Sequence, residues 1–147
     1  MDLVVRDLGN TQYGTVFDEM REFTDARRHN TLNELWVTEH APVFTQGNNG
    51  KMEHLIAPGD IPVVQSDRGG QVTYHAPGQL VGYLLFDIRR MKISPRDLVT
   101  GIERALIALL ARCNIVAKSR RNEPRDYVDD AKIASIGLRI REGRSKH

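Results

Sequence analysis

The chain has 147 residues, of which 40% are hydrophobic and 27% charged, as in an ordinary water-soluble domain. This length predicts one domain over residues 1–147, and the net charge of +2 is too small to indicate nucleic-acid binding. No apolar run approaches the roughly 20 residues of a membrane span, and no secretory signal is evident. The one cysteine excludes an internal disulfide and a cysteine-rich metal site. We therefore expect a cytoplasmic protein without metal, nucleic-acid or membrane partner.

Short strands and one helix are expected in the first half of the chain. Apolar residues recur at helical spacing at Tyr13, Val16, Phe17, Met20 and Phe23. Asn10 or Thr11 is the expected N-cap of this helix. Extended segments are expected at residues 3–6, Leu35–Val37, Val43–Thr45 and Ile61–Gln65. Residues 46–51 predict a loop that lacks the spacing of a phosphate-binding loop.

The clearest helix begins after Ser94. Ser94 is a good N-cap, Pro95 suits the first helical position, and Asp97 favours the positive helix end. The apolar stripe of this helix consists of Leu98, Val99, Ile102, Ala105, Leu106, Leu109, Leu110 and Cys113. Strands are expected at Ile115–Ala117 and Ala131–Ile140. The irregular alternation of strands and helices predicts an α+β fold, a mixed β-sheet with packed helices.

The polar segment Arg68–Gln79, which precedes the apolar run Leu80–Ile88, is typical of a ligand site. Its paired glycines allow positive φ angles and close approach of a ligand to the backbone. Arg68 could bind a carboxylate, a phosphate or a carbonyl, or pair with a neighbouring aspartate. For His75, a hydrogen-bonded structural role and a functional role are both consistent with the sequence.

Lys132 lies in the predicted strand Ala131–Ile140. Alternation along a regular strand places it on the same side as Ala134, Ile136, Leu138 and Ile140. An ammonium group at the end of an apolar face would have a lowered pKa and be useful in proton transfer. Alternatively, Lys132 is an end-of-strand lysine whose side chain extends to water. Gly137, on the opposite side, weakens a strand unless something approaches its backbone.

Other residues that often carry chemistry give weaker signals. Cys113 lies on the apolar helix stripe, and we expect a buried core residue rather than a nucleophile. His29, His40 and His54 have no metal-ligand spacing, and we assign them no role. Basic residues gather late in the chain, which indicates either a solvated surface or a docking face for an acidic partner.

Two motifs resemble those of the octanoyltransferase, or lipoyl(octanoyl) transferase, family: RGGQVTYHAPGQ at residues 68–79 and AKIASIGLR at residues 131–139. Two further stretches support the resemblance, EHAPVFTQG at residues 39–47 and GDIPVVQSD at residues 59–67. The blocks occur in the order typical of the family. The similarity covers essentially the whole chain.

The resemblance implies the fold of biotin and lipoate protein ligase catalytic domains and a protein without cofactor. It implies transfer of an octanoyl group from octanoyl-acyl carrier protein to a lysine of lipoyl domains, through a cysteine thioester. The acceptors implied are lipoyl domains of 2-oxoacid dehydrogenases and the glycine cleavage H protein. Lys132 corresponds to the lysine that activates the cysteine. The substrate-binding residues implied are Arg68, Gly69, Gly70, Gln71, Val72, Thr73, Tyr74, His75, Ser135, Ile136 and Gly137.

The chain also departs from the family pattern. The family continues past the position of His147 to its nucleophilic cysteine. Cys113 does not match the position of that cysteine. We therefore expect a catalytic domain that is incomplete at its C-terminus and inactive alone. Arg125 and Asp126 stand where the family has glycine and an apolar residue. One alternative is a non-catalytic acyl- or carrier-protein-binding module of the same fold. The other is an ATP-dependent lipoate or biotin ligase, for which Gly47–Lys51 supplies no convincing nucleotide loop.

Overall fold

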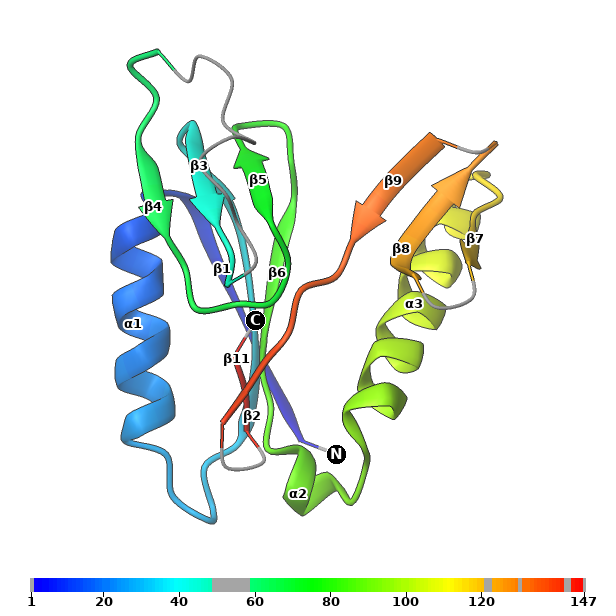
Figure 1. Ribbon diagram of the computed structural model, residues 1–147. Coiled ribbons are helices and arrows are strands. Elements are labelled where there is room, and N and C mark those ends of the chain that lie inside the picture. Colours follow the sequence, from blue (N-terminus) through cyan, green and yellow to red (C-terminus); the bar gives the residue numbers. More distant parts are fainter. Residues whose placement is uncertain (1, 49–58, 121–122, 130, 142–143, 147) are drawn as a thin grey trace. The chain divides into compact units, whose positions relative to one another are not determined.

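The computed structural model describes residues 2–48, 59–120, 123–129, 131–141 and 144–146, and it confirms the predicted α+β class (Figure 1). The helices are α1 (Tyr13–Asp25), α2 (Ile88–Met91) and α3 (Pro95–Arg112). The strands are β1 (Leu3–Thr11), β2 (Asn33–His40), β3 (Val43–Gln46), β4 (Val63–Gln65), β5 (Val72–His75), β6 (Val81–Leu85), β7 (Lys118–Arg120), β8 (Glu123–Val128), β9 (Ala131–Ser135), β10 (Arg139–Arg141) and β11 (Arg144–Lys146).

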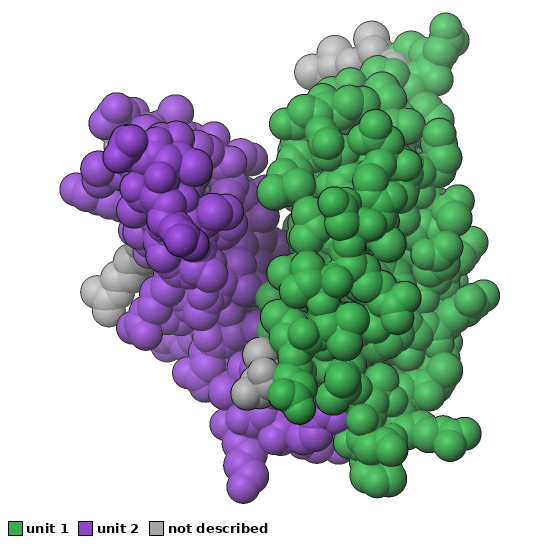
Figure 2. Space-filling model, turned by 180° about the vertical axis from the view of Figure 1, so that it is seen from behind, with its two compact units in different colours: residues 1–87, 138–147 green, residues 88–137 purple. Residues whose placement is uncertain are grey.

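The chain forms two compact units, coloured green and purple in Figure 2. The first unit consists of residues 1–87 and 138–147, and the second of residues 88–137. Among the described residues, no helix has both the length and the apolar content needed to cross a membrane. The expectation of a single domain over residues 1–147 stays a prediction.

The larger sheet of the first unit has the strand order β1-β2-β6. β1 runs parallel to β2, and β2 runs antiparallel to β6. A parallel pair needs a crossover connection, which α1 supplies (Figure 1). The buried core between this helix and the sheet consists of Val16, Met20, Trp36, Tyr83 and Leu85. The apolar periodicity that predicted α1 therefore defines the face that packs on the sheet.

Alternation along β2 also brings polar side chains to the buried face. Trp36, Thr38 and His40 occupy alternate positions and are all buried. His40 lies at the end of the strand, opposite Thr11 of β1. The buried face of this sheet thus carries the polar side chains Thr38 and His40 beyond Trp36.

A smaller sheet with the order β4-β3-β5 carries the motif at residues 68–79. β3 pairs in parallel with β4 and antiparallel with β5, so that Val43 lies opposite His75. Buried Thr45, in the middle of β3, lies opposite Thr73. The loop predicted at residues 46–51 is described only through Asn48, and the rest lies outside the described residues.

The second unit combines α3 with the antiparallel sheet β7-β8-β9. The predicted start of α3 is confirmed. Ser94 Oγ accepts a hydrogen bond from the Asp97 backbone N–H at 3.1 Å, and the Asp97 carboxylate accepts one from the Ser94 N–H at 2.8 Å. This reciprocal pair satisfies two of the backbone donors that a helix leaves open at its N-terminus.

The prediction that Cys113 is a buried core residue was wrong. α3 ends at Arg112, and Cys113 is its exposed C-cap. The next residue, Asn114, has a left-handed φ of 60°. The Cys113 and Asn114 N–H groups close a turn onto the carbonyls of Leu110 and Ala111. Ala105 and Leu109 of the same predicted stripe are exposed as well, so Cys113 lies on a part of the stripe that the fold leaves open to solvent.

Several element boundaries also differ from the predictions. The strand expected at Ile115–Ala117 begins only at Lys118. The strand expected over Ala131–Ile140 divides into β9 and β10, because these segments pair with different partners, β8 and β11. The N-cap of α1 is Gln12 rather than Asn10 or Thr11, because β1 pairs with β2 as far as Thr11.

Candidate functional site

The Arg68 side chain forms hydrogen bonds with β3 and with its own motif at residues 68–79. Its Nη2 donates to the Thr45 carbonyl at 3.0 Å and to Thr45 Oγ1 at 2.8 Å. Nη2 also approaches Thr73 Oγ1 at 3.1 Å and the Gln71 carbonyl at 2.9 Å, while Nη1 donates to the Gly69 carbonyl at 2.9 Å. A planar guanidinium with several fixed donors suits such a role. Arg68 therefore links β3 to β5 through hydrogen bonds to Thr45 and Thr73.

Gly47 makes room for this arrangement. A Cβ added to Gly47 would collide with the Gly70 carbonyl and lie 2.7 Å from Arg68 Nη1. Gly70 itself has a φ of +93°, in the region that favours glycine. The glycines at these two positions therefore allow the backbone segments to approach each other around the guanidinium.

His40 lies in a buried hydrogen-bond chain whose direction can be deduced. Thr38 Oγ1 donates to the Gly9 carbonyl at 2.7 Å, so its oxygen accepts from Thr11 Oγ1 at 2.6 Å. Since the hydroxyl proton of Thr11 is then used, Thr11 accepts from His40 Nδ1–H at 3.0 Å. His40 Nε2 is left to accept from the Tyr83 hydroxyl at 2.6 Å. Both ring nitrogens of His40 are therefore engaged.

His75 is held beside this chain by Gln79. The Gln79 amide nitrogen donates to the Tyr74 carbonyl at 3.3 Å, which turns the amide oxygen toward His75 Nδ1. Nδ1 therefore carries the ring proton and donates to that oxygen. The His75 ring stacks on Tyr13 with centroids 6.3 Å apart and planes 9° apart, and it meets His40 edge-on at 5.9 Å.

These four rings, Tyr13, His40, His75 and Tyr83, form a cluster that is uncharged near neutral pH. Burial lowers the pKa of both histidines. The pKa of His75 is further lowered by the charge of Arg68, although its bond to Gln79 acts in the opposite direction. Burial also raises the pKa of both tyrosines. A neutral imidazole keeps one nitrogen lone pair, which can accept a proton.

The remaining predicted site residues lie in the second unit. Lys132 and Ser135 are exposed on β9, and Ile136 and Gly137 are half-buried beyond its end. Lys132 pairs with Tyr127 of β8. Because β9 ends at Ser135, the regular alternation that was expected to align Lys132 with Ile136 and later residues does not continue. The structure groups Arg68–His75 within the first unit and these four residues within the second.

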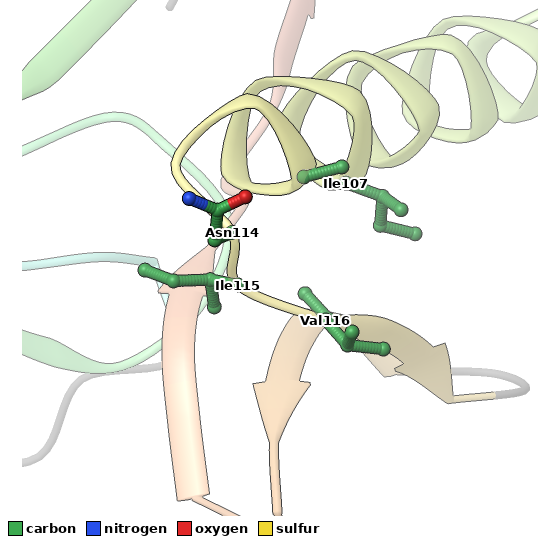
Figure 3. A pocket seen from close by; sticks show the side chains of 6 residues that line it. Ile107, Asn114, Ile115 and Val116 are labelled. Atoms are coloured by element: carbon green, nitrogen blue, oxygen red, sulfur yellow. The ribbon is translucent and has the colours of Figure 1, made fainter.

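The second unit also contains a pocket of about 400 Å³ at the C-terminal end of α3 (Figure 3). Its lining is mostly apolar and consists of Ile107, Ala111, Asn114, Ile115, Val116 and Ala117. None of the predicted site residues belongs to this lining. Within the described part of the chain, no group of His, Cys, Asp or Glu side chains could hold a metal ion.

The sequence interpretation missed Thr11, Tyr13 and Tyr83 and assigned no role to His40. Motif spacing gave no indication of them, because these residues come from four separate elements or connections. One signal was present. Thr38 and His40 follow Trp36 at alternate positions of a strand, a pattern that places polar groups on the core side.

The chain matches the family model described as the lipoyl protein ligase A/B catalytic domain over residues 4–147. A relative from Pseudomonas entomophila named octanoyltransferase is 58% identical over 145 residues, covering 99% of this chain and 67% of the relative. A relative of the same name from Pseudomonas savastanoi pv. phaseolicola is 58% identical over 142 residues, covering 97% and 65%. The chain thus spans about two thirds of the length of these relatives.

Solved structures with little sequence similarity share the fold. A bipartite lipoate protein ligase from Thermoplasma acidophilum has a TM-score of 0.77 at 14% identity. The match covers 99% of this chain and 59% of the ligase chain. Lipoate-protein ligase A bound with ATP has a TM-score of 0.74 at 13% identity, covering 99% and 64%. The fold is therefore that of the lipoate ligase catalytic domain. Within that class, the identity to the Pseudomonas relatives shows that the chain belongs to the octanoyltransferase family.

Proposed function

We propose that this chain is the larger part of an octanoyltransferase, which moves an octanoyl group from octanoyl-acyl carrier protein to a lysine of a lipoyl domain. The observation that carries the proposal is 57–58% identity to several proteins named octanoyltransferase along nearly the whole chain. Lipoyl domains of 2-oxoacid dehydrogenases and the glycine cleavage H protein are the proposed acceptors. The reaction passes through a cysteine thioester and needs no cofactor.

Residue roles follow the motifs. Lys132 keeps the nucleophilic cysteine as a thiolate, because an adjacent ammonium favours the charged form of a thiol. The stretch Arg68–His75 and the residues Ser135, Ile136 and Gly137 bind the acyl substrate. Arg68 acts indirectly, since its donors hold the surrounding backbone (Thr45, Gly69, Gln71) in shape.

Cys113 is not the proposed nucleophile. It is an exposed C-cap residue, and the pocket near the end of α3 does not include it in its lining. We propose that the acyl-accepting cysteine belongs to the part of the family that this chain does not cover. The 147-residue chain alone then forms no acyl-enzyme.

The test is incubation with octanoyl-acyl carrier protein followed by intact mass measurement. One arm uses the 147-residue chain. The other uses an extended chain, made by joining it to the segment that follows the matching region in the Pseudomonas entomophila relative. We expect a hydroxylamine-labile octanoyl adduct only on the extended chain, and then octanoyl transfer to a lipoyl domain.

Each other outcome has a defined meaning. An adduct on Cys113 of the 147-residue chain would overturn the assignment of the nucleophile. Binding of octanoyl-acyl carrier protein by the extended chain without any adduct or transfer would overturn the enzymatic proposal. That result would favour a non-catalytic acyl- or carrier-protein-binding module.

A further inference from the structure

We propose that His75 is a catalytic residue of this reaction and that Gln79 is the positioning residue that prepares it. His75 Nε2 accepts the proton that the acceptor lysine's nitrogen loses when it takes the octanoyl group. This inference rests on the proposed octanoyl transfer, and it assigns a chemical step to one residue of the substrate-binding stretch.

The tautomer of His75 is fixed by Gln79. The Gln79 amide nitrogen is bonded to the Tyr74 carbonyl at 3.3 Å, so the amide cannot turn over without losing that bond. Its oxygen accepts from His75 Nδ1, which leaves the lone pair on Nε2. No group among the residues the structure describes forms a hydrogen bond with Nε2. The open nitrogen is thus the one that can accept a proton.

The orientation of the His75 ring is fixed by its neighbours. Tyr13 stacks on it nearly in parallel, and the Tyr13 hydroxyl donates to Ser66 Oγ at 2.9 Å, which anchors the stacking ring. His40 contacts the same imidazole edge-on at 5.9 Å and is anchored through Thr11. A proton acceptor works best when it is held in place before the substrate arrives.

The other polar groups of the cluster are less suited to the step. Both nitrogens of His40 are already engaged, by Thr11 and by Tyr83. The Arg68 guanidinium donates to backbone and threonine oxygens and has no acceptor atom. Within the described part of this cluster, His75 Nε2 is therefore the imidazole nitrogen left open to a substrate.

The step balances as follows. The lone pair of the lysine amine forms the new C–N bond to the thioester carbonyl carbon, and the C–S bond breaks with its electrons leaving on sulfur. The nitrogen proton moves to His75 Nε2, giving an imidazolium, and is then returned to the cysteine thiolate. Because burial and the nearby charge of Arg68 disfavour a positive charge on this ring, the imidazolium gives up its proton readily.

The tautomer is tested first, in the 147-residue chain, by nitrogen NMR of the imidazoles. We expect His75 to carry its proton on Nδ1. Gln79→Met removes the acceptor and should shift the proton toward Nε2, whereas Gln79→Glu keeps an acceptor and should raise the pKa of His75. Gln12→Met is the matched control, since Gln12 is exposed and makes no side-chain cap bond. A parent His75 protonated on Nε2 would overturn the inference.

The chemical role is tested in the extended chain by single-turnover kinetics. His75→Gln should slow octanoyl transfer from preformed acyl-enzyme to the lipoyl domain by about 100-fold or more, the usual effect of losing a general base. Gln79→Met should slow the same step, and Gln79→Glu should retain transfer with its acid limb moved to higher pH. A purely structural Gln79 would not move that limb.

The outcomes separate the two proposals. If the parent extended chain forms no acyl-enzyme, the proposed octanoyl transfer is wrong and the role of His75 in it falls too. If the parent transfers the octanoyl group and His75→Gln transfers it equally fast, only the role of His75 is wrong.

Discussion

Asp126 provides a test of the energetics of the second unit. Its side chain is fully buried, and neither carboxylate oxygen has a hydrogen-bond partner within the described residues. Burial, followed by the negative charge of Glu103, raises the pKa of Asp126. A buried polar group without a partner costs about 1–3 kcal/mol, and more if charged. Asp126→Asn keeps the shape and an unpaired polar group but removes the additional cost of the charge, so we expect it to stabilise the protein by about 1–3 kcal/mol at pH 7.

The pH dependence gives the sign of the effect. Because the pKa of Asp126 is raised in the folded state, its penalty is absent below the unfolded value of about 3.9 and grows as pH rises toward the folded value. Asp126→Asn should therefore differ little from the parent near pH 4 and melt higher at pH 7, by roughly 2–12 °C for a chain of this length.

Thermal melts monitored by circular dichroism across this pH range are the assay for Asp126. Asp18→Asn, which removes an exposed carboxylate on α1, is the matched control. An Asp126→Asn variant that is no more stable than the parent at pH 7, or whose advantage does not depend on pH, would refute the reasoning.

Three further substitutions probe the first unit and the proposed chemistry. Thr11→Val removes the hydroxyl that accepts from the buried His40 N–H and should cost about 1–3 kcal/mol in urea unfolding. Exposed Thr15→Val is its control, and equal stability would contradict the deduced chain. Gly47→Ala should destabilise the protein by about 1–3 kcal/mol, because the added methyl group overpacks the site. Gly14→Ala on α1, where the added methyl group meets no atom within 4 Å, should stabilise the protein by about 0.5–1 kcal/mol. Thermal melts in which Gly47→Ala is as stable as Gly14→Ala would contradict this. In the extended chain, Lys132→Met should raise the thiol pKa toward about 8.5 and slow acylation, as measured by alkylation against pH; acylation as fast as in the parent would exclude a catalytic Lys132.

The sequence predicted best the features that depend on local chemistry. Ser94 and Asp97 defined the start of α3, because a capping box involves residues only three positions apart. Periodicity identified the buried face of α1 for the same reason. The exposure of Cys113 was missed because helical spacing shows which side chains share a face but not whether another element covers that face, and Ala105 and Leu109 on the same face are exposed too.

The candidate site was predictable only in part. The motif at residues 68–79 drew attention to Arg68 and His75, but not to the inward direction of the Arg68 donors. That direction depends on the pairing of β3 with β5, which joins segments far apart in sequence. The buried chain through His40 depends on β1, β2 and β6 lying side by side, and no motif links those strands. Division of the predicted strand at Ile136–Leu138 likewise depends on long-range pairing.

The discontinuous first unit has a consequence for folding during synthesis. Residues 138–141 contact the rest of this unit through the Arg141–Asp25 pair at 3.4 Å and the bond from Gly69 N–H to the Leu138 carbonyl at 3.1 Å. Between Asp87 and Leu138 a ribosome must translate the whole second unit, which takes roughly 3–10 s at about 5–20 residues per second. The first unit therefore lacks its last strands, β10 and β11, until the second unit has been synthesised. Arrest of translation before and after residues 138–146, combined with limited proteolysis, would reveal that interval.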